Sequence, residues 1–471
     1  MAVISGAAEL LIELDPSEPL REQIEERLRR AIRDGRLAPG AQLPATRTLA
    51  EGIGCSRWTV VEAYSQLAAE GYLRTRVGSG TRVAPLASVG AQTPTALPAT
   101  PSRAQFDLEP GAPDLMLFPR VAWTKALAVA VREADPAVLD YPDPGGIPAL
   151  RATLCEYLGR VRGVLAVAPS VQVCAGAAHG IGLICRALAS TGRRRLAVED
   201  PGWPTLRPFA EQAGLALVPV DVDDEGLSIE HLMTVDADAV LVTPAHQYPL
   251  GSVLSAQRRR ALLDWAHARN GLIIEDDYDV EYRYDRRPVG AMQGVSPQHV
   301  AYVGSVSKTL APALRLGWIV TPPSLQDPLC EARAGTDIGS TSALDQLALV
   351  AMLATGAYDR HLRRTRLEYR RRRQALLNAL AQHMPDMQVL GVAAGLHLLA
   401  TLPAGCDEEQ LVDEAARAGL RLKGLSSCWL REPTSFGLVL GYARMTASQL
   451  EHAVQELARI ARAPTEVKPA S

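Results

Sequence analysis

Residues 305–318 read SVSKTLAPALRLGW and directly follow an apolar run at 300–304. Lys308 lies among small and hydroxyl side chains just after that run, a setting suited to forming a Schiff base. Arg315 comes seven residues later and could fold back to hold a phosphate as a bidentate partner. Taken alone, the segment fits a surface lysine with no chemical role equally well. It does predict a buried strand that ends in a lysine-bearing turn.

A second apolar run, residues 271–274, leads straight into Glu275, Asp276 and Asp277 and then Tyr278. In an open α/β sheet, ligands bind outside the carboxyl ends of the strands, which is where these acids would project. Pyridoxal phosphate requires a lysine for its aldehyde, an aspartate for its pyridine nitrogen and a cup for its phosphate. Metal binding or helix capping is the alternative use of such acids. The lysine favours the cofactor, with an aspartate of this cluster as the partner of the pyridine nitrogen.

Two further segments complete this hypothesis. Residues 174–180, CAGAAHG, read as a strand end, a small-residue turn and a helix start, so the amides of Ala177 and Ala178 would attract an anion. Trp203 follows a third strand and offers a flat indole that could stack on the pyridine ring or belong to the core.

Apolar runs alternate with amphipathic helices over some 360 residues, which is typical of βαβ units around a mostly parallel sheet. The expected strands are 171–175, 196–199, 215–222, 239–243, 271–276, 300–304 and 316–321. An arginine-rich helix at 358–381 then leads to a small α+β segment with strands at 396–401 and 437–442 and a closing helix at 447–460.

The N-terminal residues have a different pattern. Leu20, Ile24, Leu28 and Ile32 fall on one helical face. A second helix is expected at 46–53, ending at Gly54, and a third begins after Ser56 as N-cap. The third would turn Val60, Tyr64 and Leu67 inward, and a strand, a glycine turn and a second strand follow it. These features predict a winged helix-turn-helix, although a three-helix oligomerisation module fits the periodicity too.

Charge and composition support this division. Residues 19–84 hold 11 Arg and 7 Asp+Glu, a net charge of +4, whereas the whole chain carries -3. A local positive field suits a DNA-binding domain. The chain has only four lysines, Lys125, Lys308, Lys423 and Lys468.

We expect domains at 10–84 and 105–465, joined by a Pro/Ala/Thr/Ser linker at 85–104. Seven scattered cysteines without a C-x-x-C pair indicate reduced thiols and no zinc site. A signal peptide or spanning segment is not apparent, so a cytoplasmic protein with no membrane partner is expected.

Residues 39–83, PGAQLPATRTLAEGIGCSRWTVVEAYSQLAAEGYLRTRVGSGTRV, closely resemble the winged helix-turn-helix of the GntR family of bacterial repressors. The resemblance implies that this domain binds a double-stranded DNA operator. The residues that would contact the DNA are Arg47, Ser56, Arg57, Thr59 and Gly78. Trp58 departs from the smaller polar residue that such repressors often have.

The motifs LDYPDPGGIPALR, VEDPGWP, TPAHQYPLG, IIEDDYD and SVSKTLAPALRLGW, in this order, resemble the MocR subfamily of GntR regulators. The resemblance implies a type I aminotransferase fold that binds pyridoxal phosphate. Lys308 would bond the aldehyde, Asp276 the pyridine nitrogen and Tyr278 the ring hydroxyl. Asp277 could replace Asp276 if the strand register slips by one. The phosphate would be held by Ser305, Arg315 and the amides of Ala177 and Ala178, and by Tyr141 from the neighbouring subunit of a homodimer. Tyr248 stands where catalytic aminotransferases usually have an asparagine.

This sequence departs from the catalytic relatives where they bind the substrate. Their C-terminal arginine, which clamps the substrate carboxylate, is absent from the matching stretch GLVLGYA, and no arginine precedes Arg444 there. Thr205 stands where another arginine would follow Trp203, and Ala178 replaces a residue that is often polar. We therefore expect a regulator that responds to pyridoxal phosphate, with vitamin B6 or amine metabolism genes as candidate targets, and without a catalytic residue set. The alternative is an active aminotransferase carrying a DNA-binding head.

Overall fold

The computed structural model describes residues 15, 17–76, 80–85, 104–141, 143–285, 289–334, 341–403 and 405–462. The chain divides into two compact units, Met1–Ser102 and Arg103–Ser471. Several predictions lie outside the described residues: Gly78, nearly all of the 85–104 linker, and the outer ends of the two predicted domains near residues 10 and 465.

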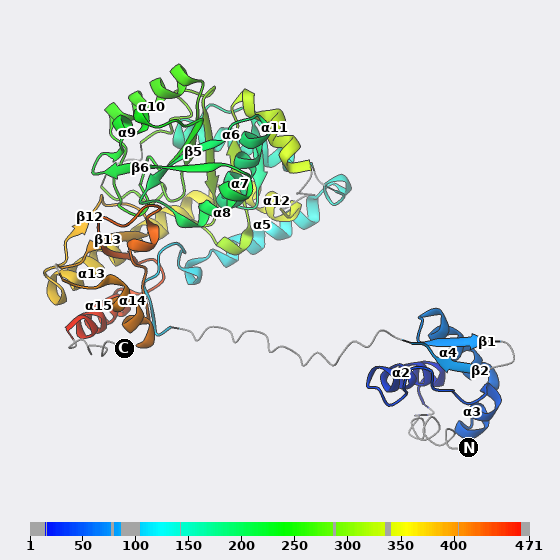
Figure 1. The fold of residues 1–471 in the computed structure, drawn as a ribbon. Helices are drawn as coiled ribbons and strands as arrows, with labels where there is room; N and C mark the ends of the chain where they lie inside the picture. Colours follow the sequence, from blue (N-terminus) through cyan, green and yellow to red (C-terminus); the bar gives the residue numbers. More distant parts are fainter. Residues whose placement is uncertain are drawn as a thin grey trace. The chain divides into compact units, whose positions relative to one another are not determined.

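Helices and a two-stranded antiparallel sheet form the N-terminal unit (Figure 1): α2 (Leu20–Arg33), α3 (Thr46–Ile53), α4 (Arg57–Ala69), β1 (Leu73–Arg76) and β2 (Gly80–Val83). Ile24, Leu28 and Ile32 of α2 pack in one core with Val60, Tyr64 and Leu67 of α4, as the periodicity predicted. Leu20, at the first position of its helix, is only half-buried.

Two local caps set the tight turn between α3 and α4. Gly54 ends α3 in the left-handed conformation, with φ of 69°, which a glycine adopts without steric cost. Ser56 begins α4, and its side chain accepts a hydrogen bond from the Thr59 amide at 3.1 Å. The predicted helix-turn-helix and its two wing strands are therefore confirmed.

The larger unit contains an eight-stranded sheet with the strand order β4-β11-β10-β9-β8-β5-β6-β7. The strands are β4 (Val171–Cys174), β5 (Arg195–Asp200), β6 (Ala216–Asp223), β7 (Gly226–Leu227), β8 (Ala239–Val242), β9 (Leu272–Asp276), β10 (Val300–Ser305) and β11 (Gly317–Val320). β11 runs antiparallel to both of its neighbours, and β7 runs antiparallel to β6. All seven strands predicted for this sheet occur, and its remaining strand, β7, has two residues and was not predicted.

Helices cover both faces of this sheet (Figure 1), which explains its continuous apolar strands. On one face Ile274 and Val303 pack with α7 (Ala177–Ser190), α8 (Arg207–Gln212) and α11 (Pro323–Ala334). On the other face Ile273 and Val300 pack with α9 (Ile229–Thr234) and α10 (Ala256–Arg269). α5 (Arg120–Glu133), α6 (Pro148–Arg162) and α12 (Ala343–Ala354) belong to a third cluster, with Val173 and Val320.

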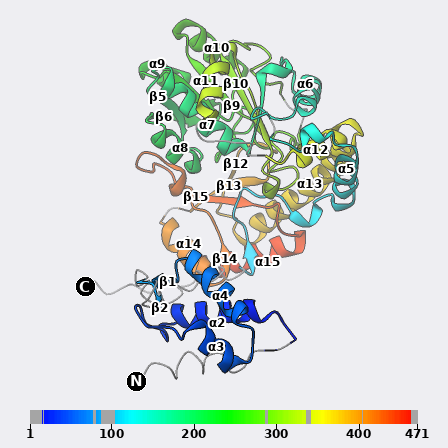
Figure 2. The same ribbon diagram turned by 90° about the vertical axis from the view of Figure 1, so that its right-hand side faces the viewer.

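The C-terminal part of the unit has its own sheet, β12-β13-β15, and packs with three helices (Figure 2). Its elements are β12 (Val389–Leu390), β13 (His397–Thr401), β15 (Gly437–Gly441), α13 (Ala357–His383), α14 (Glu408–Arg417) and α15 (Ala447–Arg462). A parallel pair of short strands, β3 (Phe106–Asp107) and β14 (Leu420–Arg421), lies beside them. The predicted strands and closing helix are present, and none of the described helices has the length and apolarity to cross a bilayer.

The Ser56 cap generates a stability prediction. Ser56→Ala should destabilise the start of α4 by about 1 kcal/mol, because the Thr59 amide loses its acceptor. Hydrogen exchange of the α4 amides in the full chain measures this. Ser56→Asp keeps an acceptor and should retain most of the protection; equal loss in both variants would contradict the capping role.

Candidate functional site

A cavity of about 320 Å³ lies at the carboxyl edge of the parallel strands. Its lining comes from the segments that follow β4, β5, β8, β9 and β10, which all end at this edge, and from the segment that precedes the antiparallel β11. Residues 109–111, which follow β3, and residues of the C-terminal part complete it. The lining comprises Glu109, Pro110, Gly111, Gly176, Ala177, Ala178, Trp203, Thr205, Thr243, Tyr248, Asp276, Tyr278, Asp279, Ser305, Ser307, Lys308, Pro312, Arg315, Leu396, His397 and Lys423.

The cavity brings together nine of the ten residues predicted to contact the cofactor. The tenth, Tyr141, is outside the lining and 87% exposed. The sequence reasoning assigned Tyr141 to the site of a neighbouring subunit, so its position here agrees with that expectation without testing it.

Lys308 and Asp276 meet because β9 and β10 are parallel neighbours. Val303 of β10 is paired with Asp276 of β9, and the loop after β10 carries Lys308. The ammonium of Lys308 donates a hydrogen bond to the Gly111 carbonyl. Burial lowers the pKa of Lys308, while Asp279 and Asp276 oppose that shift. A lowered pKa increases the share of neutral amine, the form that attacks an aldehyde.

Asp276 is 3% exposed, and its Oδ1 has no hydrogen-bond partner among the described residues. Burial, reinforced by the charge of Asp277, raises the pKa of Asp276 to about 8. Asp277 itself is outside the lining: it forms a buried ion pair with Arg162 at 2.7 Å and accepts a hydrogen bond from Tyr302 at 2.6 Å. Of the two candidate aspartates, the structure therefore places Asp276 in the cavity.

One end of the cavity is built to receive an anion. Helix α7 begins there after Gly176, whose φ is 96°, and the amides of Ala177 and Ala178 have no acceptor among the described residues. Ser305 and Arg315 line the same cavity. A Cβ placed on Gly176 would lie 3.6 Å from Arg315 Nη1, so the guanidinium is next to this helix start.

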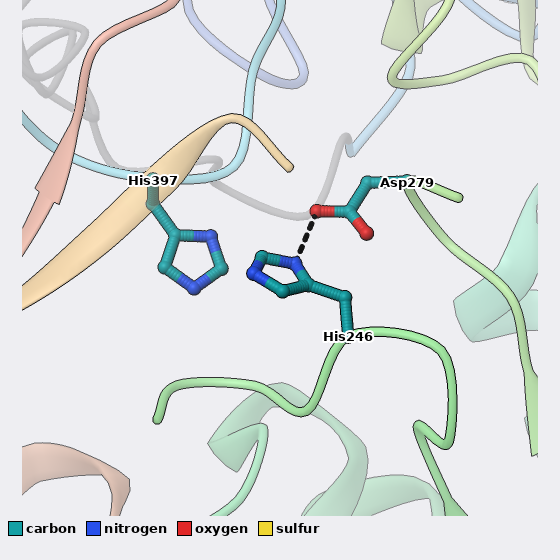
Figure 3. Close-up of side chains that lie close together, drawn as sticks. All are labelled: His246, Asp279 and His397. Atoms are coloured by element: carbon teal, nitrogen blue, oxygen red, sulfur yellow. Dashed lines mark hydrogen bonds and ion pairs between the residues drawn. The ribbon is translucent and has the colours of Figure 1, made fainter. Parts of the chain in front are cut away.

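Sequence reasoning missed a buried group of three side chains, His246, Asp279 and His397 (Figure 3). His246 Nδ1 lies 2.9 Å from Asp279 Oδ2 and 3.1 Å from the Tyr278 hydroxyl. His397 faces His246, with ring centroids 5.0 Å apart. His246 was within a quoted motif, TPAHQYPLG, but no local pattern pointed to its partners 33 and 151 residues away.

The His246, Asp279 and His397 ligand atoms lie within 4.8 Å of one another, close enough to hold a metal ion. Asp279 Oδ2 and His246 Nδ1 are already bonded to each other, and the Lys308 charge acts on both Asp279 and His397. A hydrogen-bonded support for Tyr278 fits these contacts better than a cation site. Tyr248, another lining residue, packs edge-on against His397 at 5.1 Å.

Of the five residues predicted to bind DNA, Gly78 is outside the described residues; Arg47, Ser56 and Arg57 are exposed and Thr59 is half-buried. Arg57 is exposed at the start of α4, and its Nε lies 3.4 Å from Thr46 Oγ1 of α3. Thr59 shares a 2.8 Å hydrogen bond with Ser56. The Arg47 side chain is 81% exposed and paired with Glu51. Trp58, for which no contact was predicted, is 70% exposed beside Arg57.

Comparisons with known proteins divide the chain in the same way. Residues 20–83 match the gntR family of bacterial regulatory proteins, and residues 104–457 match the class I and II aminotransferases. The larger unit also resembles solved aminotransferases in fold. An archaeal alanine:glyoxylate aminotransferase is 22% identical with a TM-score of 0.69, and the match covers 76% of this chain and 91% of that one. LysN, an alpha-aminoadipate aminotransferase from Thermus thermophilus, is 23% identical with a TM-score of 0.68 and coverages of 76% and 92%.

Two regulators match over nearly the whole length. PdxR of Corynebacterium glutamicum, an HTH-type pyridoxine biosynthesis transcriptional regulator, is 34% identical over 96% of this chain and 98% of its own. The probable rhizopine catabolism regulatory protein MocR of Rhizobium meliloti is 33% identical over 95% of each chain. With both the winged helix-turn-helix and the aminotransferase-like unit matched in this order, the chain belongs to the MocR subfamily of GntR-type transcriptional regulators.

Proposed function

We propose that this regulator senses pyridoxal phosphate in the cavity of its larger unit and binds its operator through the N-terminal unit. The buried Asp276 carboxylate supports the proposal most strongly. Its Oδ1 has no hydrogen-bond partner in the part of the chain that the structure describes, and Lys308 follows the adjacent strand. Burying a carboxylate oxygen without a hydrogen-bond partner costs free energy, which a ligand atom that bonds to it would offset. The protonated nitrogen of a pyridine ring is such an atom.

The nine predicted residues of the lining then have distinct parts in holding the cofactor. Bound pyridoxal phosphate supplies an aldehyde that condenses with a primary amine, which is the role of Lys308. Asp276 holds a proton at the pyridine nitrogen, and Tyr278, positioned by His246, donates to the ring hydroxyl. The phosphate is held by Ser305, Arg315 and the amides of Ala177 and Ala178. Trp203 and Tyr248 lie against the pyridine ring.

We further propose a homodimer in the cytoplasm, in which Tyr141 reaches the phosphate in the neighbouring subunit. The exposure of Tyr141 leaves it free for that contact. The names of PdxR, MocR and the related regulator TauR suggest target genes in vitamin B6 or amine metabolism.

At the operator, Arg57 is proposed to read a base edge and the other four predicted residues to contact or approach the backbone. An arginine at the start of a recognition helix can form two bonds to guanine. Ser56 and Thr59, linked by their hydrogen bond, present hydroxyls at the same helix end.

Borohydride labelling tests the lysine. After incubation with pyridoxal phosphate, reduction should fix the cofactor on Lys308, identified by peptide mass spectrometry. Lys308→Ala should lose this label yet keep measurable affinity, because the phosphate site is separate from the aldehyde. Labelling at Lys125 or Lys423 would contradict the assignment.

The pKa of Asp276 generates a prediction on stability. The folded protein keeps this carboxyl protonated up to about pH 8, whereas the unfolded chain ionises near its ordinary value of 3.8. The stability that this group contributes is therefore lost as the pH rises through that window. In urea denaturation without cofactor, Asp276→Asn should lose less stability than the wild type between about pH 5 and about pH 8.

A matched control and a second readout sharpen this test. Asp224→Asn, at an exposed position, should follow the wild-type pH dependence. Asp276→Asn should also bind pyridoxal phosphate more weakly, because a neutral amide can accept a hydrogen bond from a protonated pyridine nitrogen but cannot form an ion pair with it. A variant with wild-type pH dependence and wild-type affinity would refute the role of Asp276.

Arg57→Ala tests the DNA contact. The variant should lose about 1–3 kcal/mol of operator binding and tolerate more base changes in each half-site. Arg36→Ala, which removes an exposed arginine paired with Asp34 elsewhere in the unit, is the control in the same mobility-shift titration. Unchanged operator affinity in Arg57→Ala would exclude this assignment of the recognition helix.

A further inference from the structure

Lys423 is the second lysine in the cavity, in a chain that has only four. It is half-buried and has no hydrogen bond or ion pair from its side chain among the described residues. The other two cations of the lining already have parts in the proposed function: Lys308 for the aldehyde and Arg315 for the phosphate. Lys423 is therefore a positive charge in the cavity that the cofactor leaves unused.

The backbone fixes Lys423 beside the stretch that lacks the expected arginine. Its carbonyl accepts a hydrogen bond from the Val439 amide at 2.9 Å, and the next residue, Gly424, bridges to Leu438. Val439 belongs to the GLVLGYA stretch, and its side chain is fully buried in an apolar cluster with Leu399. The apolar side chain of Val439 cannot bind an acid group. Lys423, in the segment that bonds to the Val439 backbone, brings a cation to the cavity instead.

The arginines nearby have other partners. Arg444 is paired with Asp107, and Arg431 with Asp200 and Asp221. Arg207 donates to the Cys428 carbonyl at 2.7 Å. None of these three arginines lines the cavity.

His397 adds a second unsatisfied group to the same cavity. It is 3% exposed, and its Nε2 has no partner among the described residues. Burial holds the pKa of His397 well below its ordinary value, so the ring is neutral. Its backbone hydrogen bond is with Pro249, which has only a carbonyl to offer, so the ring N–H is used there. Nε2 therefore carries a lone pair that can accept a hydrogen bond from a ligand.

We propose that Lys423 binds a carboxylate of the effector, so that the cavity takes an amino acid beside pyridoxal phosphate in preference to a simple amine. This inference rests on the proposed function, since the ligand shares the cavity with the cofactor. An amino acid supplies both complements at once: an acid group for Lys423 and an N–H donor for His397.

Stable adducts test the carboxylate without any reaction. Phosphopyridoxyl-alanine and phosphopyridoxyl-ethylamine differ only in the carboxylate, and calorimetry on the cofactor-free full chain measures the affinity of each. The wild type should prefer the alanine adduct by about tenfold or more, as expected for a hydrogen bond to a charged group. Lys423→Met should abolish that preference and leave the affinity for the ethylamine adduct unchanged.

Two further variants serve as controls. Lys125→Met, at an exposed position of α5, should keep the full preference, and Lys423→Arg should keep part of it. If Lys423→Met fails to fold, as judged by loss of ethylamine-adduct binding, Lys423→Gln replaces it.

The outcomes separate this inference from the proposed function. Equal affinities in the wild type, or a preference that survives both Lys423→Met and Lys423→Gln, would overturn the carboxylate site while leaving the cofactor cavity in place. Failure of the wild type to bind either adduct would overturn the cofactor cavity itself, and the carboxylate site with it.

Discussion

The parallel register between β9 and β10 is the constraint on which the cavity depends. It pairs Val303 with Asp276, so the acid and the loop of Lys308 reach the same edge of the sheet. A slip of one residue would turn every side chain of β9 to the opposite face. The buried ion pair between Arg162 and Asp277 opposes that slip, because moving Asp277 would leave the Arg162 guanidinium without its partner at the protein interior.

The reversed strand β11 has a second, less obvious part in the site. Because β11 runs antiparallel to β4 and β10, the residues just before its start lie at the edge where the parallel strands end. Arg315, two residues before the start of β11, is one of them and has a positive φ of 50°. Gly317 allows the close approach: a Cβ there would lie 2.8 Å from the Gly176 Cα. Gly176 before α7 and Gly317 at the start of β11 thus bring the arginine to the start of the helix.

The two sides of the cavity come from different parts of the larger unit. The sheet edge contributes residues of short loops after buried strands, whereas His397 and Lys423 come from the C-terminal part of the unit. A ligand that contacts both sides would bind more tightly to one relative position of the sheet edge and the C-terminal part than to another. Such a difference in affinity between arrangements is what any effector needs in order to change a regulator's binding to DNA.

The sequence by itself determined the local features of this protein. Gly54 and Ser56 cap their own helices, and apolar runs of four to eight residues marked every strand of the large sheet except β7. The resemblance carried by the motifs also named nine residues that the structure brings together in one cavity. Only the tertiary structure decided between Asp276 and Asp277, because the direction of a side chain at a strand end depends on the register with the next strand. It also revealed His246, His397 and Lys423, whose partners and cavity come from segments far apart in the chain, where no local pattern records a contact.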